Sequence, residues 1–170
     1  ALNSPRGIIA NPNCTTAQLV VALQAIEEIA HIKRAHVATY QAASGAGAAA
    51  MQELEDQYKQ LANGEEPTVS KFAYQLAYNL IPQVDVFTDN GYTKEEMKMV
   101  NETRKILQDS SIDVCATAVR VPVAFGHSES IYLEFDNEIS IDSALDILDN
   151  TPGVVLQKDS NKYHTPIEIE

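Results

Sequence analysis

The 170-residue sequence has few cations, only two cysteines and no long apolar run. Lys and Arg together number 12 against 24 Asp and Glu, which gives a formal net charge of -12. A chain this acidic repels phosphate backbones and anionic lipid at long range, so nucleic acid and membranes are poor partner classes. No apolar run reaches the ~20 residues needed to cross a bilayer. A small anionic substrate is still compatible, because a few local cations outweigh a distant net field.

The scarcity of cysteine also bears on the compartment. Cys14 and Cys115 cannot form a disulfide framework, and the first residues lack the basic and apolar regions of a signal peptide. We therefore expect a reducing, cytoplasmic setting, and we predict no metal site. The chain has no initiator Met and starts one short loop before an apolar run, so we expect a piece of a longer protein.

Hydrophobic periodicity predicts the order of helices and strands. A short strand is expected at residues 8–10, followed by a helix with a Thr15–Gln18 capping box, a strand at 32–40 and a helix at 45–61. Residues 63–91 are expected to be a long irregular excursion. The remaining expectations are a helix from a Thr93–Glu96 capping box to 108, strands at 114–122 and 130–135, a short helix capped by Ser140, and a last strand at 154–157.

This order favours one fold class. Strands and helices are partly segregated along the chain, and 45% of residues are hydrophobic against 21% charged, as in ordinary globular domains. We predict an α+β fold with a mixed, largely antiparallel sheet covered by helices on one face.

Cys14 is a candidate nucleophile. It stands at the expected start of a helix, where free N–H groups and the helix dipole favour the thiolate. A thiolate is the nucleophile that thioester chemistry needs. The alternative, a small packed cysteine, stays open on this evidence. Cys115 lies in a valine-rich run and is expected in the core.

Several other polar residues stand where sites are built, each with a plainer alternative. His127 follows an apolar strand and could serve as the base for a thiol. Arg120 lies among valines, so it needs either an ion-pair partner or a substrate carboxylate. Glu95 and Lys98 share a helix face and could simply form a solvated ion pair. The small-residue loop at 41–47 is a weak anion-site signal, since it matches neither a P-loop nor G-x-G-x-x-G.

Together these segments resemble the aspartate-semialdehyde dehydrogenase family. The resemblance rests on Asn11-Pro12-Asn13-Cys14-Thr15-Thr16, Gln41-Ala42-Ala43-Ser44-Gly45-Ala46-Gly47, Tyr78-Asn79-Leu80-Ile81-Pro82-Gln83, Glu95-Glu96-Met97-Lys98, and Arg120-Val121-Pro122-Val123 leading to Gly126-His127-Ser128-Glu129. The segments follow the family's order and spacing over nearly the whole chain. The resemblance implies a domain like the C-terminal domain of glyceraldehyde-3-phosphate dehydrogenase-like proteins.

The resemblance also implies a reaction and a set of roles. The family reduces L-aspartyl-4-phosphate to L-aspartate 4-semialdehyde with NADPH, in the biosynthesis of lysine, methionine, threonine and diaminopimelate. By position, Cys14 would form the acyl thioester, His127 would be the general base and Gln41 would position the acyl group. Arg120 would bind the α-carboxylate and Glu95 the ammonium. Lys98 and Asn13 would hold the phosphate, while Ser44 and Gly45 would line the nicotinamide side of NADP.

The sequence departs from the family in one large respect, since the dinucleotide-binding half is missing. We expect residues 1–13 to be the end of that domain, and residues 14–170 to be the catalytic and dimerisation domain, shortened at its C-terminus. The resemblance also places the family's dimer interface in the half that is present, so the chain is expected to form a homodimer. Candidate contacts are Phe72, Leu76, Leu80 and Ile81. We expect these residues alone not to turn over NADPH, because hydride transfer needs nicotinamide within ~3–3.5 Å of the acyl carbon.

Other functions remain open at this point. An N-acetyl-glutamyl-phosphate reductase-like enzyme has a similar cysteine segment, but its substrate lacks the free ammonium that Glu95 would bind. A thiol hydrolase could use Cys14, His127 and Gln41, although the usual C-G-S-C-W-like signature is absent. A non-catalytic dimerisation module is the third alternative.

Overall fold

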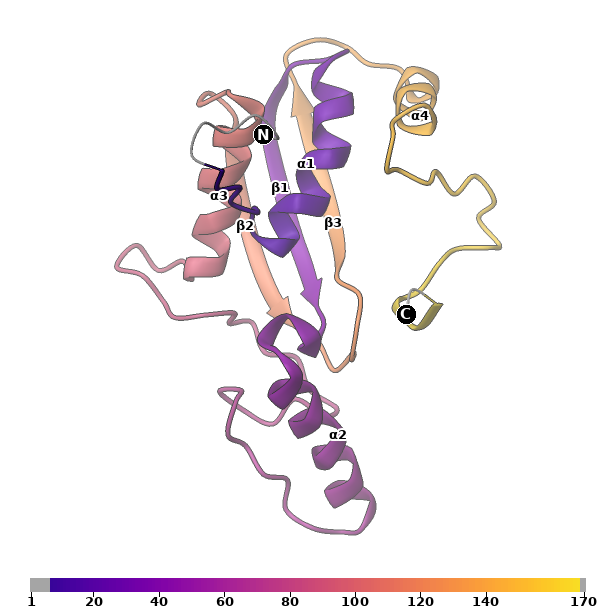
Figure 1. The fold of residues 1–170 in the computed structure, drawn as a ribbon. Coiled ribbons are helices and arrows are strands. Elements are labelled where there is room, and N and C mark those ends of the chain that lie inside the picture. Colours follow the sequence, from indigo (N-terminus) through magenta and orange to yellow (C-terminus); the bar gives the residue numbers. More distant parts are fainter. Residues whose placement is uncertain (1–6, 169–170) are drawn as a thin grey trace.

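A computed structural model describes residues 7–168 (Figure 1). Its elements in chain order are α1 (Cys14–Glu27), β1 (Ile32–Gln41), η1 (Ala43–Ala46), α2 (Ala48–Ala62), α3 (Lys94–Leu107), β2 (Asp113–Arg120), β3 (Ser128–Phe135), α4 (Ile141–Asp149) and η2 (Pro166–Glu168). Within the described residues, no helix is long and apolar enough to cross a membrane.

The three strands form one mixed sheet in the order β2-β1-β3. Central β1 pairs in parallel with β2, which places Gln41 beside Arg120, and antiparallel with β3, which places Thr39 beside Glu129. Helices α1 and α3 lie side by side over one face of the sheet (Figure 1). The predicted α+β class and mixed sheet are thus confirmed.

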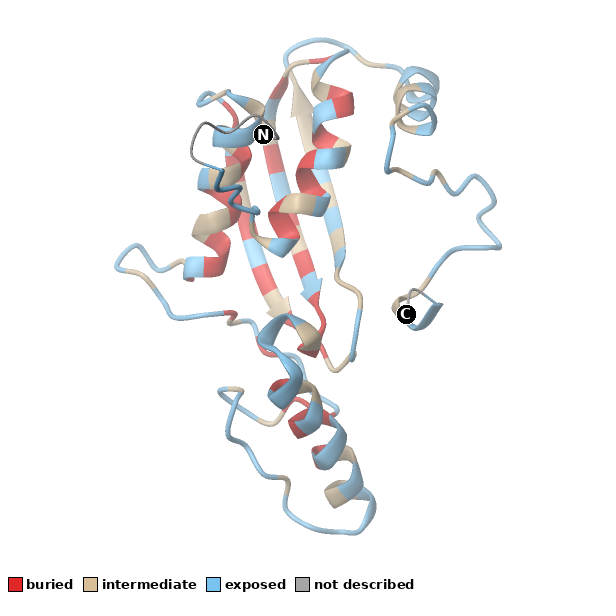
Figure 2. Ribbon diagram, in the orientation of Figure 1, coloured by how far each residue is buried: buried red, intermediate tan, exposed pale blue. Residues whose placement is uncertain are grey.

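Side chains alternate across β1 as the pleat requires. Ala35, Val37 and Thr39 point into the core beneath the helices, whereas His36 and Tyr40 lie on the opposite, exposed face. The buried stripes of the strands and of α1 and α3 face one another (Figure 2). The resulting core is built from apolar side chains of these elements, including Leu19, Leu23, Ile32, Met99 and Ile112.

Helix α1 begins two residues earlier than the predicted cap at Thr15 implies. Its N-cap is Asn13, whose Oδ1 accepts hydrogen bonds from the N–H groups of Thr15 (3.1 Å) and Thr16 (3.3 Å). The predicted cap, Thr15, instead donates its hydroxyl hydrogen to the same Asn13 oxygen. Asparagine is among the best N-cap residues, and here it precedes the weaker Thr. The correction places Cys14 at the first helical position.

The other helix starts agree better with the sequence. Thr93 and Glu96 form the predicted capping box at the start of α3, and Ser140 caps α4 through the N–H of Ser143. Helix α2 starts slightly later than predicted. Gly47 lies at a φ of 91°, in the region that favours glycine, and separates the short turn η1 from α2.

Two predicted strands are wrong. Residues 8–10 and 154–157 have no regular secondary structure. Ile8, Ile9 and Val155 are 75%, 55% and 82% exposed, so these apolar runs are not buried by the described residues. A short apolar run becomes a strand only where another strand offers backbone partners, and neither segment has one within residues 7–168.

The excursion at 63–91 lacks helices and strands, as predicted, yet it is well anchored. A second cluster of buried side chains joins this segment to α2. The cluster consists of Ala43, Leu54, Leu76, Ala77 and Ile81. Leu76 and Ile81 are 0% and 3% exposed, so the expectation that both are surface contacts for a partner subunit is wrong. Leu80 remains exposed, at 60%, and Phe72 is partly buried.

Two buried polar side chains of α2 hold the excursion in place. The Glu53 carboxylate accepts hydrogen bonds from the N–H groups of Ser70 (3.1 Å) and Lys71 (2.6 Å) and from the Ser70 hydroxyl (2.6 Å). The Gln57 carbonyl accepts from the N–H groups of Leu76 and Ala77. Side chains thus replace the backbone partners that an irregular segment lacks.

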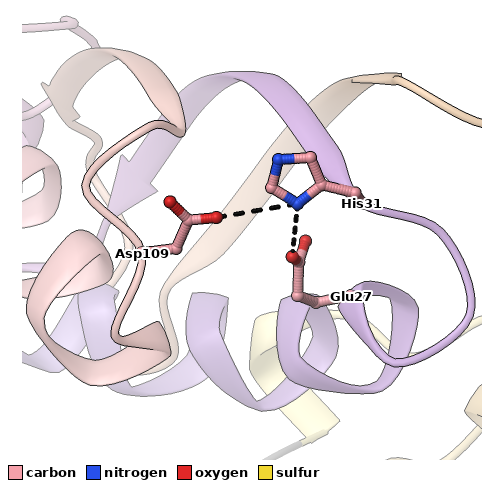
Figure 3. Close-up of side chains that lie close together, drawn as sticks. All are labelled: Glu27, His31 and Asp109. Atoms are coloured by element: carbon pink, nitrogen blue, oxygen red, sulfur yellow. Dashed lines mark hydrogen bonds and ion pairs between the residues drawn. The ribbon is translucent and has the colours of Figure 1, made fainter.

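A cluster of ionisable groups lies at the start of β1, at the opposite end from Gln41 (Figure 3). Nδ1 of His31 lies 2.7 Å from a Glu27 carboxylate oxygen and 3.6 Å from one of Asp109. The hydrogen bond to Glu27 is the main cause that raises the pKa of His31. These three residues come from the end of α1, the turn before β1 and the turn after α3, so they tie these ends together.

The anchoring role of Glu53 can be tested by Glu53→Ala. We expect the free energy of unfolding to fall by about 2–4 kcal/mol, since the Ser70 hydroxyl and the N–H groups of Ser70 and Lys71 lose a charged acceptor. Denaturant unfolding measures the loss, and faster amide exchange at 70–72 should accompany it. The control Glu55→Ala removes an exposed carboxylate from the same helix, paired only with Lys59, and should cost less than about 1 kcal/mol. Equal losses in both variants would contradict the anchoring role.

Candidate active site

Chain direction explains why the predicted site residues meet. Strands β1 and β2 are parallel, so their last residues, Gln41 and Arg120, lie at the same edge of the sheet. Strand β3 is antiparallel to β1, so its start, next to His127, lies at that edge too. Helices α1 and α3 each precede a strand that they cover. Their first turns, which carry Cys14 and Glu95, therefore also point to this edge.

Cys14 and His127 are in contact, although 113 positions separate them. The Cys14 sulfur lies 3.4 Å from Nε2 of His127. The other ring nitrogen, Nδ1, accepts a hydrogen bond from the backbone N–H of Ala42 at 3.1 Å. Burial lowers the pKa of His127, and the positive charge of Arg120 lowers it further, against an opposing effect of Glu95.

Arg120 is a buried cation, only 7% exposed. Its Nη1 donates to the carbonyl oxygen of Ala42 at 2.6 Å. Within residues 7–168 no carboxylate lies within 4 Å of the guanidinium. A buried charge without a counter-ion is costly, so an anion bound beside this guanidinium would stabilise it.

Glu95 is the centre of a second hydrogen-bonded group and is 5% exposed. Its Oε1 accepts from Nδ2 of Asn13 at 2.9 Å and from Nε2 of Gln41 at 3.0 Å. Its Oε2 accepts from Nζ of Lys98 at 3.2 Å. Burial lowers the pKa of Lys98, but the carboxylates of Glu95 and Asp85 raise it by more. The positive charge of the ammonium is therefore stabilised. Three of the predicted site residues, Asn13, Gln41 and Lys98, are therefore brought together around the Glu95 carboxylate.

The small-residue loop borders the same site. A Cβ added at Gly45 would lie 3.0 Å from Nε2 of His127 and 3.1 Å from Nη1 of Arg120, closer than such contacts normally come. Only glycine allows the backbone to lie so near these side chains. Ser44 is next to it and its N–H donates to the carbonyl of Ala124.

One electrostatic expectation needs correction. The helix start was expected to favour the Cys14 thiolate, but the pKa of this thiol is raised. Burial is the largest cause and the nearby Glu95 carboxylate the second. The backbone N–H groups of Thr15 and Cys14, together with Arg120, lower the pKa by less. The surroundings of Cys14 therefore outweigh the helix dipole. Cys115 is also free and only partly buried, so its expected place in the core is wrong as well.

Comparison with known proteins agrees with this geometry. Residues 23–169 match the family model described as semialdehyde dehydrogenase, dimerisation domain. The aspartate-semialdehyde dehydrogenase of Aquifex aeolicus (strain VF5) is 52% identical over 168 residues, which cover 97% of this chain and 49% of that protein. This chain belongs to the aspartate-semialdehyde dehydrogenase family.

Solved structures of the family show the same fold. The crystal structure of aspartate semialdehyde dehydrogenase II from Vibrio cholerae complexed with ASA has a TM-score of 0.93 and 46% sequence identity, covering 96% of this chain and 48% of that one. An aspartate semialdehyde dehydrogenase with NADP from Candida albicans has a TM-score of 0.58 at 27% identity, covering 83% and 35% of the two chains. The chain thus spans about half the length of the family members it matches.

Sequence reasoning missed two residues at this family site, Ala42 and Glu129. Ala42 forms hydrogen bonds with His127 and Arg120 through its backbone, which no side-chain pattern reveals. Glu129 lies in β3, two positions after His127, and pairs with Thr39 of β1. Its Oε1 is buried without a hydrogen-bond partner in the described residues. Burial raises the pKa of Glu129 to about 7, against a smaller opposing effect of a hydrogen bond from Gln18.

The raised pKa of the partly buried Glu129 predicts a pH-dependent stability. Between pH 4.5, its ordinary pKa, and about 7, the folded chain binds more protons at Glu129 than the unfolded chain does. The free energy of unfolding should therefore fall as pH rises through this window and stay low above it. Glu129→Gln should gain on the order of 2 kcal/mol over wild type at pH 8, and little at pH 4.5.

Denaturant unfolding at the two pH values measures the gain. The control Glu134→Gln changes a carboxylate on the same strand that is paired with Arg34, and it should give no gain at pH 8. A Glu129→Gln variant that follows the wild-type pH profile would show that this carboxyl does not titrate near neutrality.

Proposed function

We propose that this chain carries the thiol chemistry of an aspartate-semialdehyde dehydrogenase. The reaction converts L-aspartyl-4-phosphate to L-aspartate 4-semialdehyde and phosphate through an acyl thioester on Cys14. The observation that carries the proposal is the buried Arg120 guanidinium, which has no ion-pair partner in the described residues and lies beside the Cys14–His127 pair. The names of the relatives support this reaction class.

Each charged group of the substrate has a complementary side chain here. Arg120 suits the α-carboxylate, because its planar fork can donate two hydrogen bonds to the two oxygens. Glu95 suits the ammonium, and this favours an amino-acid substrate over an N-acetylated one. Lys98 and Asn13 border Glu95 and would hold the phosphate. Gln41, which donates to Glu95, would position the acyl group.

The chain's own residues then perform the acyl transfer. The Cys14 sulfur bonds to the acyl carbon, the carbon–oxygen bond to phosphate breaks, and phosphate leaves beside Lys98. His127, whose Nε2 lies 3.4 Å from that sulfur, would accept the thiol proton as the general base and pass it to the leaving phosphate. By binding the α-carboxylate, the buried Arg120 would fix the orientation of the acyl group relative to the Cys14 sulfur. Such fixed orientation accounts for much of enzymatic rate enhancement.

The loop at Ser44 and Gly45 fits the nicotinamide end of NADP. Gly45 is exposed, and its lack of a side chain leaves a flat surface against His127 and Arg120 that a Cβ would disturb. When bound, NADPH supplies the hydride that reduces the thioester. We expect most other contacts with NADP to come from the part of the full-length family proteins that this chain does not span. Residues 1–13 would end that dinucleotide-binding domain, and 14–170 would be the catalytic and dimerisation domain.

We also propose a homodimer that forms on the uncovered face of the sheet. The matched family model is a dimerisation domain, and α1 and α3 cover only the other face (Figure 2). Tyr40 and Tyr132 are 45% and 62% exposed on the uncovered face, and His36 lies against Tyr132. A cytoplasmic location is proposed as well, since both cysteines are free.

The substrate assignment is tested by protection of Cys14 from iodoacetamide, in a Cys115→Ser background. L-aspartate 4-semialdehyde adds reversibly to the thiol and should slow alkylation, read by mass spectrometry. In Arg120→Met the protecting concentration should rise at least about 30-fold, the effect of losing a buried charge-paired contact worth about 2 kcal/mol. Succinate semialdehyde, which lacks the ammonium, should protect less well than the amino acid.

The matched control is Arg34→Met, which removes a half-exposed arginine at the far end of β1. It should leave protection unchanged, and circular dichroism should show both variants folded. If 3-aminopropanal, which lacks the carboxylate, protected as well as the amino acid, the assignment of Arg120 would be wrong.

The dimer is tested by sedimentation at micromolar concentration. Tyr132→Glu places a charge on the uncovered sheet face and should shift the chain from dimer towards monomer, because burying an unpaired charge is costly. The control Tyr74→Glu changes an equally exposed tyrosine on the excursion and should stay dimeric. A wild-type chain that sediments only as monomer would contradict the proposal.

A further inference from the structure

The two helices that carry the site satisfy the N–H group of their N-cap residue in different ways. In α3 the N–H of Thr93 donates to the carboxylate of Glu96, three residues further along the same helix, at 2.7 Å. The corresponding position in α1 is Thr16, which has no carboxylate to offer. Instead, the N–H of Asn13 donates to Oε2 of Glu102, in α3, also at 2.7 Å. The start of α1 is therefore capped in part by the neighbouring helix.

We propose that Glu102 is a positioning residue for the acyl transfer: by accepting the N–H of Asn13, it sets where the Cys14 sulfur stands relative to the substrate-binding groups of α3. The inference rests on the proposed function and gives Glu102 no contact with the substrate. The two bonded residues are 89 positions apart, and one of them directly precedes Cys14. A hydrogen bond from a backbone N–H to a carboxylate is stronger than one to a neutral acceptor.

Asn13 uses its backbone and side-chain polar groups in hydrogen bonds. Its Oδ1 caps α1 by accepting from N–H groups of the first turn, and its carbonyl oxygen accepts from the N–H of Ala17 at 2.8 Å. Its Nδ2 donates to Oε1 of Glu95 at 2.9 Å. Within residues 7–168, only the bonds to Glu95 and Glu102 join Asn13 to another element. With both in place, Asn13 cannot turn about either one.

Both of these bonds come from one side of α3. Glu95, Lys98 and Glu102 are spaced by three and four residues, so they share a helix face. An α-helix rises about 1.5 Å per residue, so Glu95 and Glu102 lie about 10 Å apart along the axis. Because the helix backbone is rigid, this separation is fixed. The sulfur of Cys14, next to Asn13, is thereby kept in register with the groups proposed to bind the ammonium and the phosphate.

Glu102 acts through position and not through charge. Burial is the main cause that raises the pKa of the Cys14 thiol. The charged side chains that shift this pKa further are Glu95, which raises it, and Arg120, which lowers it. Glu102 is not among them. An amide in place of the carboxylate should therefore preserve the role, provided that its oxygen still accepts the N–H of Asn13.

The test is protection of Cys14 from iodoacetamide by L-aspartate 4-semialdehyde, in the Cys115→Ser background. Glu102→Ala removes the acceptor, so the half-protecting concentration should rise about 10-fold, because small displacements of a reacting group are costly. Glu102→Gln keeps an acceptor oxygen and should stay within about 3-fold of wild type. Without ligand, the alkylation rate should change by less than about 3-fold in both variants, since it depends on the thiolate fraction and on exposure.

The matched control is Arg104→Met, two residues further along α3. It removes the hydrogen bond from Nε of Arg104 to the carbonyl oxygen of Ile112 (2.8 Å), which joins α3 to the residue before β2. Stability should fall, but protection should equal that of wild type. Unchanged protection in Glu102→Ala, or a loss as large in Glu102→Gln or in Arg104→Met, would overturn the inference. A wild-type chain that the semialdehyde does not protect would contradict the proposed function itself.

Hydrogen exchange measures the contact without any ligand. The N–H of Asn13 should exchange at least about 10-fold more slowly in wild type and in Glu102→Gln than in Glu102→Ala, because a bonded amide exchanges only when it opens. Circular dichroism should show that all three chains are folded. Equal exchange rates at Asn13 in wild type and Glu102→Ala would show that Glu102 does not hold this residue, whatever the outcome of the protection assay.

Discussion

The site depends on backbone hydrogen bonding that continues past the ends of the parallel strands β1 and β2. Beyond Gln41 and Arg120, the chains stay paired through the N–H groups of Val121, Ala43 and Ser44. This continuation keeps Ala42 buried and extended, with its N–H and C=O turned to side chains instead of to a neighbouring strand. The imidazole and guanidinium of the site are therefore held by main chain, which rotates less freely than a side chain does.

Charge is distributed in a way that suits an anionic amino-acid substrate. The chain as a whole carries -12, yet the site holds two cations, Arg120 and Lys98, around the single buried carboxylate of Glu95. Arg120 is the more deeply buried and has no ion-pair partner within the described residues, while Lys98 is partly exposed and shared with Asp85. In the function we propose, the substrate carboxylate would therefore meet the more deeply buried cation and the phosphate the more exposed one.

Local signals in the sequence predicted elements well where they act over a few residues. The capping box at Thr93 and Glu96 and the cap at Ser140 needed only neighbouring positions, and both occur as predicted. The apolar runs at 8–10 and 154–157 were misleading, because a strand also needs a partner supplied from elsewhere in the chain. The excursion at 63–91 was correctly seen as irregular, but its burial depends on Glu53 and Gln57, whose long-range contacts leave no local pattern.

The sequence by itself determined the α+β class, the order of the helices and of the three strands that form the sheet, and, through its family resemblance, the set of residues Asn13, Cys14, Gln41, Glu95, Lys98, Arg120 and His127 that the fold brings together. Local hydrogen bonding, periodicity and motif order are enough for that. Only the tertiary structure decided that the Cys14 thiol has a raised pKa, that partial burial raises the pKa of Glu129, and which nitrogen of His127 faces the sulfur. These properties depend on burial and on atoms from distant elements within a few ångströms, and such distances exist only once the chain has folded.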